Sequence, residues 1–127
     1  MVRGIGVDST SISEMEHMLE QDTGAFLERV FTGAERAAEP NGLGRAQYYA
    51  DRFAAKEAVF KAVAPLVPEK TFDLRMVESL HRDDGSPYIH VTPELEEVLR
   101  RAQVTKLHLS ITNECDLATA FVVATND

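Results

Sequence analysis

The chain has 127 residues, 44% of them hydrophobic, which is the length and composition of a single globular domain spanning residues 1–127. Thirteen basic and 21 acidic residues give a net charge of −8, which argues against nucleic-acid or anionic-membrane partners because both require a positive surface. The single cysteine, Cys115, excludes an internal disulfide, and no stretch has the roughly 20 apolar residues of a membrane span. We therefore expect a cytoplasmic protein.

The first third of the chain predicts a strand followed by helices. Residues 2–8, VRGIGVD, form a short apolar run with an acidic end, which is typical of a strand. Ser11 or Ser13 is expected to cap the helix that follows, and the T-G-A-E sequence at 32–35 is a capping-box pattern. Residues 40–44 predict a loop. The apolar face of the first helix is expected to carry Met15, Met18 and Leu19.

A long helix is predicted at residues 45–64, where strong helix formers are followed by Pro65. Arg52 and Lys56 lie one turn apart on this helix, and Glu57 lies in an otherwise alanine-rich stretch. One flank of the helix carries Tyr49, Phe53, Phe60 and Ala64.

The second half of the chain alternates like a sheet. Two strands are joined by an Asp-Asp-Gly-Ser turn at 83–86, and a helix with Pro93 in its first turn separates them from two final strands. The fold class is therefore α+β, with a mainly antiparallel sheet packed on the long central helix. The expected elements are strands at 73–82 and 87–92, a helix at 93–102, and strands at 106–112 and 117–125.

Two acids, Asp8 at a strand end and Glu57 on the long helix, are candidate metal ligands. If they converge, two carboxylates without histidine or thiolate suit Mg²⁺, which combines one or two protein acids with waters and substrate phosphates. Arg52, Lys56 and Lys61 would then steady a phosphate. The alternative is that these are solvated surface groups, with Glu57 paired to Lys61 four residues later.

Three segments in this order and spacing resemble the holo-acyl-carrier-protein synthases, which are 4′-phosphopantetheinyl transferases. These segments are GIGVD at 4–8, RFAAKEA at 52–58 and HLSIT at 108–112. The resemblance continues through FLERVFTGAE at 26–35, DGSPYIHV at 84–91 and ATAFVVAT at 118–125, so it covers nearly the whole chain.

The resemblance implies a homotrimer with active sites at subunit interfaces. It implies transfer of 4′-phosphopantetheine from coenzyme A to a serine of an acyl or peptidyl carrier protein, in fatty-acid, polyketide or peptide synthesis, releasing adenosine 3′,5′-bisphosphate. The acceptor of the serine proton stays open between Glu57 and a metal-bound water. The residue roles it implies are Mg²⁺ binding for Asp8 and Glu57, coenzyme A binding for Arg52, Phe53 and Ser110, and phosphate contact or proton transfer for Lys56 and Lys61.

The chain departs from the family's usual pattern at three places. Asn113 stands where histidine is usual, so its contact with a coenzyme A phosphate would be a hydrogen bond without a cation. Residues 64–67, APLV, replace a glycine-rich turn, and Glu14 lies near a usual arginine for carrier-protein binding. These departures leave two alternatives open: a non-catalytic binding or scaffold component, or an enzyme acting on another phosphopantetheine-linked substrate.

Overall fold

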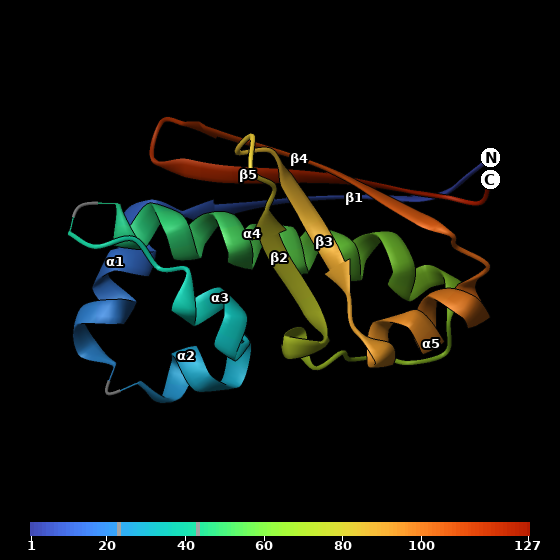
Figure 1. The fold of residues 1–127 in the computed structure, drawn as a ribbon, viewed down its shortest axis with the longest axis horizontal. Helices are drawn as coiled ribbons and strands as arrows, with labels where there is room; N and C mark the ends of the chain where they lie inside the picture. Colours follow the sequence, from blue (N-terminus) through green and yellow to red (C-terminus); the bar gives the residue numbers. More distant parts are fainter. Residues whose placement is uncertain (23, 43) are drawn as a thin grey trace.

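The computed structural model describes residues 1–22, 24–42 and 44–127, which form two antiparallel sheets around the long helix α4. In Figure 1, α4 runs beneath the sheet of β1, β5 and β4, the hairpin of β2 and β3 crosses it, and α1 to α3 gather at the opposite end from α5. The elements are β1 (Val2–Ser11), α1 (Ile12–Gln21), α2 (Ala25–Val30), α3 (Gly33–Ala37), α4 (Arg45–Val63), β2 (Val77–His81), β3 (Pro87–Val91), α5 (Pro93–Ala102), β4 (Lys106–Glu114) and β5 (Leu117–Thr125), with short 3₁₀ turns at Ala64–Leu66 and Leu74–Met76.

β1 packs against α4 with almost no side chain between them. A Cβ atom added at Gly6 would lie well inside van der Waals contact with the carbonyl oxygen of Ala58, and one at Gly4 would do the same with Ala62. Only glycine on the strand and alanine on the helix allow this backbone approach. The packing therefore fixes the position of β1 along α4.

The three-stranded sheet has one buried face and one exposed face. Its order is β1-β5-β4, with β5 in the centre. The inward side chains of β5 are fully buried, whereas outward Phe121 is 44% exposed. Phe121 lies opposite Val7 of β1 and Ser110 of β4, which places these two residues on the exposed face. The buried residues of β5 are Ala118, Ala120, Val122 and Ala124.

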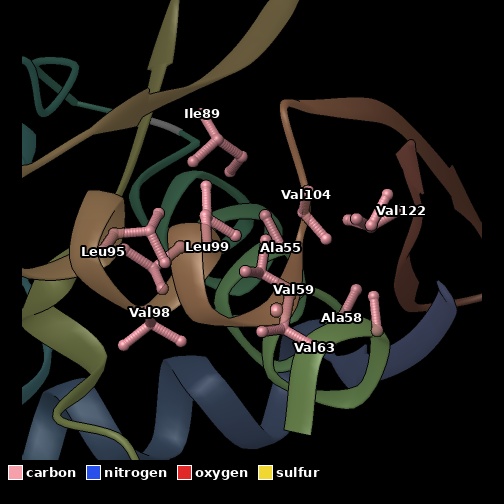
Figure 2. Packing of buried hydrophobic residues seen from close by; sticks show 14 of the residues in the cluster. Ala55, Ala58, Val59, Val63, Ile89, Leu95, Val98, Leu99, Val104 and Val122 are labelled. Atoms are coloured by element: carbon pink, nitrogen blue, oxygen red, sulfur yellow. The ribbon is translucent and has the colours of Figure 1, made fainter. Parts of the chain in front are cut away.

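The main core lies between α4, α5 and the two sheets. Leu95, Val98 and Leu99 of α5 gather beside Val59 and Val63 of α4 (Figure 2). The structure confirms the helix predicted at 93–102 with the same bounds. Among the described residues, no helix is long and apolar enough to cross a bilayer.

Several local predictions are confirmed, and others need correction. Ser11 caps α1, and Thr32 forms the capping box with Glu35. The expected strand at 73–82 begins only at Val77, because Asp73 caps a 3₁₀ turn before it. The antiparallel sheet is divided into a three-stranded and a two-stranded part. In the expected loop at 40–44, residue 43 lies outside the described residues.

Candidate active site

Asp8 is held on the α4 side of β1 by contacts to both of its carboxylate oxygens. It shares a strand face with Gly4 and Gly6, so the close packing of β1 on α4 brings it to the helix. Lys61 donates from Nζ to Asp8 Oδ1 at 3.1 Å and to the carbonyl oxygen of Val7 at 3.1 Å. Thr10 donates to Asp8 Oδ2 at 3.2 Å. The Asp8 side chain is only 17% exposed, whereas Lys61 is 51% exposed.

Glu57 of α4 belongs to the same cluster. Burial raises the pKa of Glu57, the negative charge of Asp8 raises it further, and Lys61 opposes both effects. Lys61 forms its ion pair with Asp8, so the simple pairing of Glu57 with Lys61 is not what the structure has. Asp8, Glu57 and Lys61 therefore make up the candidate cluster, in which Asp8 and Lys61 form an ion pair and both charges act on the pKa of Glu57.

The donor set of this cluster fits a magnesium ion. No group of three or more His, Cys, Asp or Glu side chains suited to a metal occurs in residues 1–22, 24–42 and 44–127. Mg²⁺ needs no such group, because it is commonly held by one or two carboxylates and completes its shell with water and phosphate oxygens. Asp8 and Glu57 would be its protein ligands.

Lys56, expected beside a phosphate, lies in the interior. Both it and Glu35 are fully buried, and Lys56 Nζ lies 2.7 Å from Glu35 Oε1. The ammonium group also donates to the carbonyl oxygens of Leu74, at 2.9 Å, and Val77. Burial lowers the pKa of Lys56, and Glu35 opposes that shift. Its three hydrogens are thus occupied, so this geometry disfavours the expected phosphate contact.

Arg52 and Phe53 lie in a neighbouring part of α4. The Arg52 guanidinium stacks 3.7 Å from the ring centroid of Tyr48, donates to the Tyr48 carbonyl oxygen at 3.2 Å and contacts His81 Nδ1. Burial and the Arg52 charge lower the pKa of His81, which favours a neutral ring that accepts from Arg52. Phe53 is half-buried, with its ring centroid 6.2 Å from that of Phe26.

Ser110 and Asn113 lie on β4, two strands away from Asp8. Ser110 is on the exposed face of the sheet, not in a buried strand position. Asn113 Nδ2 donates to Asp51 Oδ1 at 2.6 Å, and its Oδ1 accepts from Gln47 at 3.0 Å. Asparagine thus fastens the end of β4 to α4 at the position where the family usually has histidine.

The other two departures also have clear locations. Residues 64–66 form a 3₁₀ turn, and Leu66 and Val67 pack against the core. Glu14 lies on α1 beside a hollow of about 810 Å³. None of Asp8, Glu57 and Lys61 lines this hollow. The hollow is lined by Ser13, Glu14, His17, Met18, Gln21, Asp22, Phe26 and Arg29.

Three polar residues near these positions were not predicted. Glu35 was explained by its capping box, which hid its pairing with Lys56. His81 and Asp51 gave no signal, because their partners Arg52 and Asn113 are 29 and 62 residues away in the chain.

Comparison with known proteins shows the family of the chain. Residues 4–124 match the model of the 4′-phosphopantetheinyl transferase superfamily. The chain belongs to this superfamily. Among curated members it is similar to the holo-[acyl-carrier-protein] synthase of Mesorhizobium japonicum, at 35% identity over 97% of this chain and 92% of the relative. It is likewise similar to that of Brucella ovis, at 36% identity over 97% of this chain and 94% of the relative.

Solved structures of this superfamily share the fold. The holo-[acyl-carrier-protein] synthase of Neisseria meningitidis superposes with a TM-score of 0.86 at 31% identity, over 99% of this chain and 100% of that one. The synthase of Bacillus anthracis, solved in complex with coenzyme A (3′,5′-ADP), superposes with a TM-score of 0.78 at 30% identity, over 100% and 99% of the two chains. These neighbours confirm the predicted mixture of helices and antiparallel sheet.

Proposed function

We propose that the protein transfers 4′-phosphopantetheine from coenzyme A to a serine of an acyl or peptidyl carrier protein and releases adenosine 3′,5′-bisphosphate. The observation that carries this proposal is the cluster of Asp8, Glu57 and Lys61. It stands in a chain that is similar over 97% of its length to holo-[acyl-carrier-protein] synthases. The exposed free thiol of Cys115 accords with a reducing, cytoplasmic location.

In this proposal Asp8 and Glu57 bind Mg²⁺. When bound, the ion offsets the charge of the pyrophosphate and of the leaving phosphate. Burial raises the pKa of Glu57 most, the charge of Asp8 raises it further, and a divalent cation would offset the negative charge of both carboxylates. Lys61 orients a phosphate oxygen, because its half-exposed ammonium group is held 3.1 Å from Asp8.

The exposed face of the three-stranded sheet is proposed as the interface of a homotrimer. Ile5, Val7 and Phe121 are 62%, 53% and 44% exposed, an unusual number of apolar groups on one sheet face. Ser110 shares this face, so subunit packing would place it near a neighbouring subunit. That accounts for the separation of Ser110 from Asp8 within one chain.

The test is intact-mass spectrometry of several apo carrier proteins incubated with the protein, coenzyme A and Mg²⁺. We expect a mass gain of one phosphopantetheine group that is lost with Asp8→Ala and kept with Asp83→Ala, a control in the exposed turn at 83–86. If no carrier gains mass and calorimetry detects no coenzyme A binding, the scaffold alternative replaces the proposal. Coenzyme A binding without transfer to any carrier would instead indicate a different substrate.

A further inference from the structure

We propose that the buried ion pair of Lys56 and Glu35 is a positioning device that sets the rotation of α4 about its axis and so aims Glu57 toward Asp8. Lys56 is thereby a positioning residue, not a group that touches substrate. The inference rests on the proposed function, because it assumes that the direction of Glu57 matters for the reaction.

The pair connects three elements to α4. Lys56 donates to the carbonyl oxygens of Leu74, in the 3₁₀ turn, and of Val77, the first residue of β2. Glu35 Oε1 accepts from the Thr32 amide at 2.8 Å, and its Oε2 accepts from the Ser79 amide at 2.8 Å. The start of α3, the 3₁₀ turn and β2 are therefore all fastened to one point of α4.

Stability alone is a poor explanation for such a pair. A buried ion pair loses the hydration of both charges, so apolar groups of similar volume are often equally stabilising or better. What the pair adds is direction, since each hydrogen bond is satisfied in only one arrangement of the three elements. In several proteins, polar groups in the core select one structure among alternatives. Here the pair selects one rotation of α4 about its axis.

The geometry of a helix connects this clamp to the active site. Successive residues are about 100° apart around the axis, so Glu57 lies about 100° from Lys56 and Ala58 lies about 200° away, on the opposite side. Ala58 is where β1 contacts the helix. The helix is thus held from two opposite sides, with Glu57 between them.

A small rotation would matter. With side chains about 5–6 Å from the axis, a turn of about 10° moves the Glu57 carboxylate by roughly 1 Å. Displacements of about 1 Å in a catalytic arrangement can lower rates by about 100-fold. A clamp against rotation would consequently support the geometry of the site.

The test compares Lys56→Met, the charge-balanced double variant Glu35→Gln/Lys56→Met, and Leu99→Ala as a control. Leu99→Ala lowers stability by removing apolar packing between α5 and α4 while leaving the Lys56–Glu35 pair intact. Four quantities are measured: the urea midpoint, the affinity for Mn²⁺ by electron paramagnetic resonance without coenzyme A, and kcat and KM for transfer. Mn²⁺ serves as the probe for the Mg²⁺ site.

We expect the double variant to recover much of the urea midpoint lost by Lys56→Met. Its Mn²⁺ affinity and kcat are still expected to be about 10-fold lower than in the wild type, as is usual when groups supporting metal ligands are removed, with little change in KM for coenzyme A. Leu99→Ala is expected to lower the urea midpoint but to leave the Mn²⁺ affinity and kcat unchanged.

A folded double variant with wild-type Mn²⁺ affinity and kcat would overturn the inference, since charge balance would then be the only role of the pair. If the double variant does not fold, the single variant Glu35→Gln provides the test. An unchanged Mn²⁺ affinity in Glu35→Gln would also overturn the inference. Failure of the proposed function is a separate result, recognised by a wild-type protein that transfers nothing to any carrier.

Discussion

The chemical state of Glu57 depends on the fold. Its carboxyl group is partly withdrawn from water and faces the charge of Asp8, and both effects raise its pKa. A raised carboxyl pKa means that the ionised form is disfavoured in the folded protein. The same group is the proposed metal ligand, so the site is built at some expense of stability, as is common where function demands it.

Replacing Glu57 by Gln should therefore stabilise the metal-free protein at neutral pH while lowering transfer by at least about 100-fold. Because the folded pKa exceeds the unfolded value near 4.3, the wild type loses stability as pH rises through the folded pKa. The two proteins should be equally stable below about pH 4 and diverge above it. Urea unfolding between pH 4 and 8 measures this, and a Glu57→Gln protein that is less stable at pH 7 would contradict it.

Residue types were enough to select candidates for the site. Asp8 and Glu57 were singled out by their positions on a strand end and in an alanine-rich helix. The structure pairs Asp8 with Lys61, and burial together with the Asp8 charge raises the pKa of Glu57. The side of α4 on which a cation would act was not predictable. A helical wheel places Lys56 and Lys61 on different flanks, but only the tertiary packing of α3 and β2 decides that the Lys56 flank is buried.

At the scale of elements, the distance between β1 and α4 decides whether Asp8 reaches the helix. Gly6→Ala is expected to lower the free energy of unfolding by at least about 2 kcal/mol, because its Cβ would overlap the Ala58 carbonyl group and force the elements apart. Transfer activity should fall in the fraction that remains folded. Chemical denaturation and the mass assay measure the two effects.

Gly33→Ala is the matched control for that substitution. Gly33 begins α3, and a Cβ added there meets nothing within 4 Å. Alanine at this position is expected to raise stability by up to about 1 kcal/mol, since it restricts the unfolded chain and favours the helix. Equal losses in both variants would show that the close packing of β1 is not responsible.

Elements with strong local signals were predictable to the residue. The helix at 93–102 has a capping Thr92, Pro93 at its start and an apolar stripe, and its bounds are confirmed. The 3₁₀ turns at 64–66 and 74–76 were not predicted. Their hydrogen bonds depend on local backbone geometry and on packing against the core, which composition does not specify.

At the scale of the whole molecule, the exposed sheet face tests the proposed trimer. The wild type is expected at about three times the 14.1 kDa mass of one chain by light scattering. Phe121→Glu should give monomers, because it places a charge between Val7 and Ser110 in the middle of the apolar face. Lys70→Glu, an exposed change of charge elsewhere, should leave the mass unchanged. A wild-type monomer would contradict the interface.

The sequence pattern did not predict the division into two sheets or the order of the strands. Alternation predicted the strands and the hairpin of β2 with β3, because those pairings are local. Which distant strand would pair with β1 depends on the complete fold. The structure pairs it with β5, from the other end of the chain.

That pairing has a consequence for synthesis on the ribosome. β1 is made first, yet its only hydrogen-bonded neighbour among the described strands is β5, with Val2 opposite Thr125. The strand that carries Asp8 therefore cannot pair with β5 until almost all of these residues have emerged. Pairing across so many residues is slow to form, so α4 and the β2–β3 hairpin are expected to fold first. The nascent chain would stay unable to consume coenzyme A until its last strand is in place.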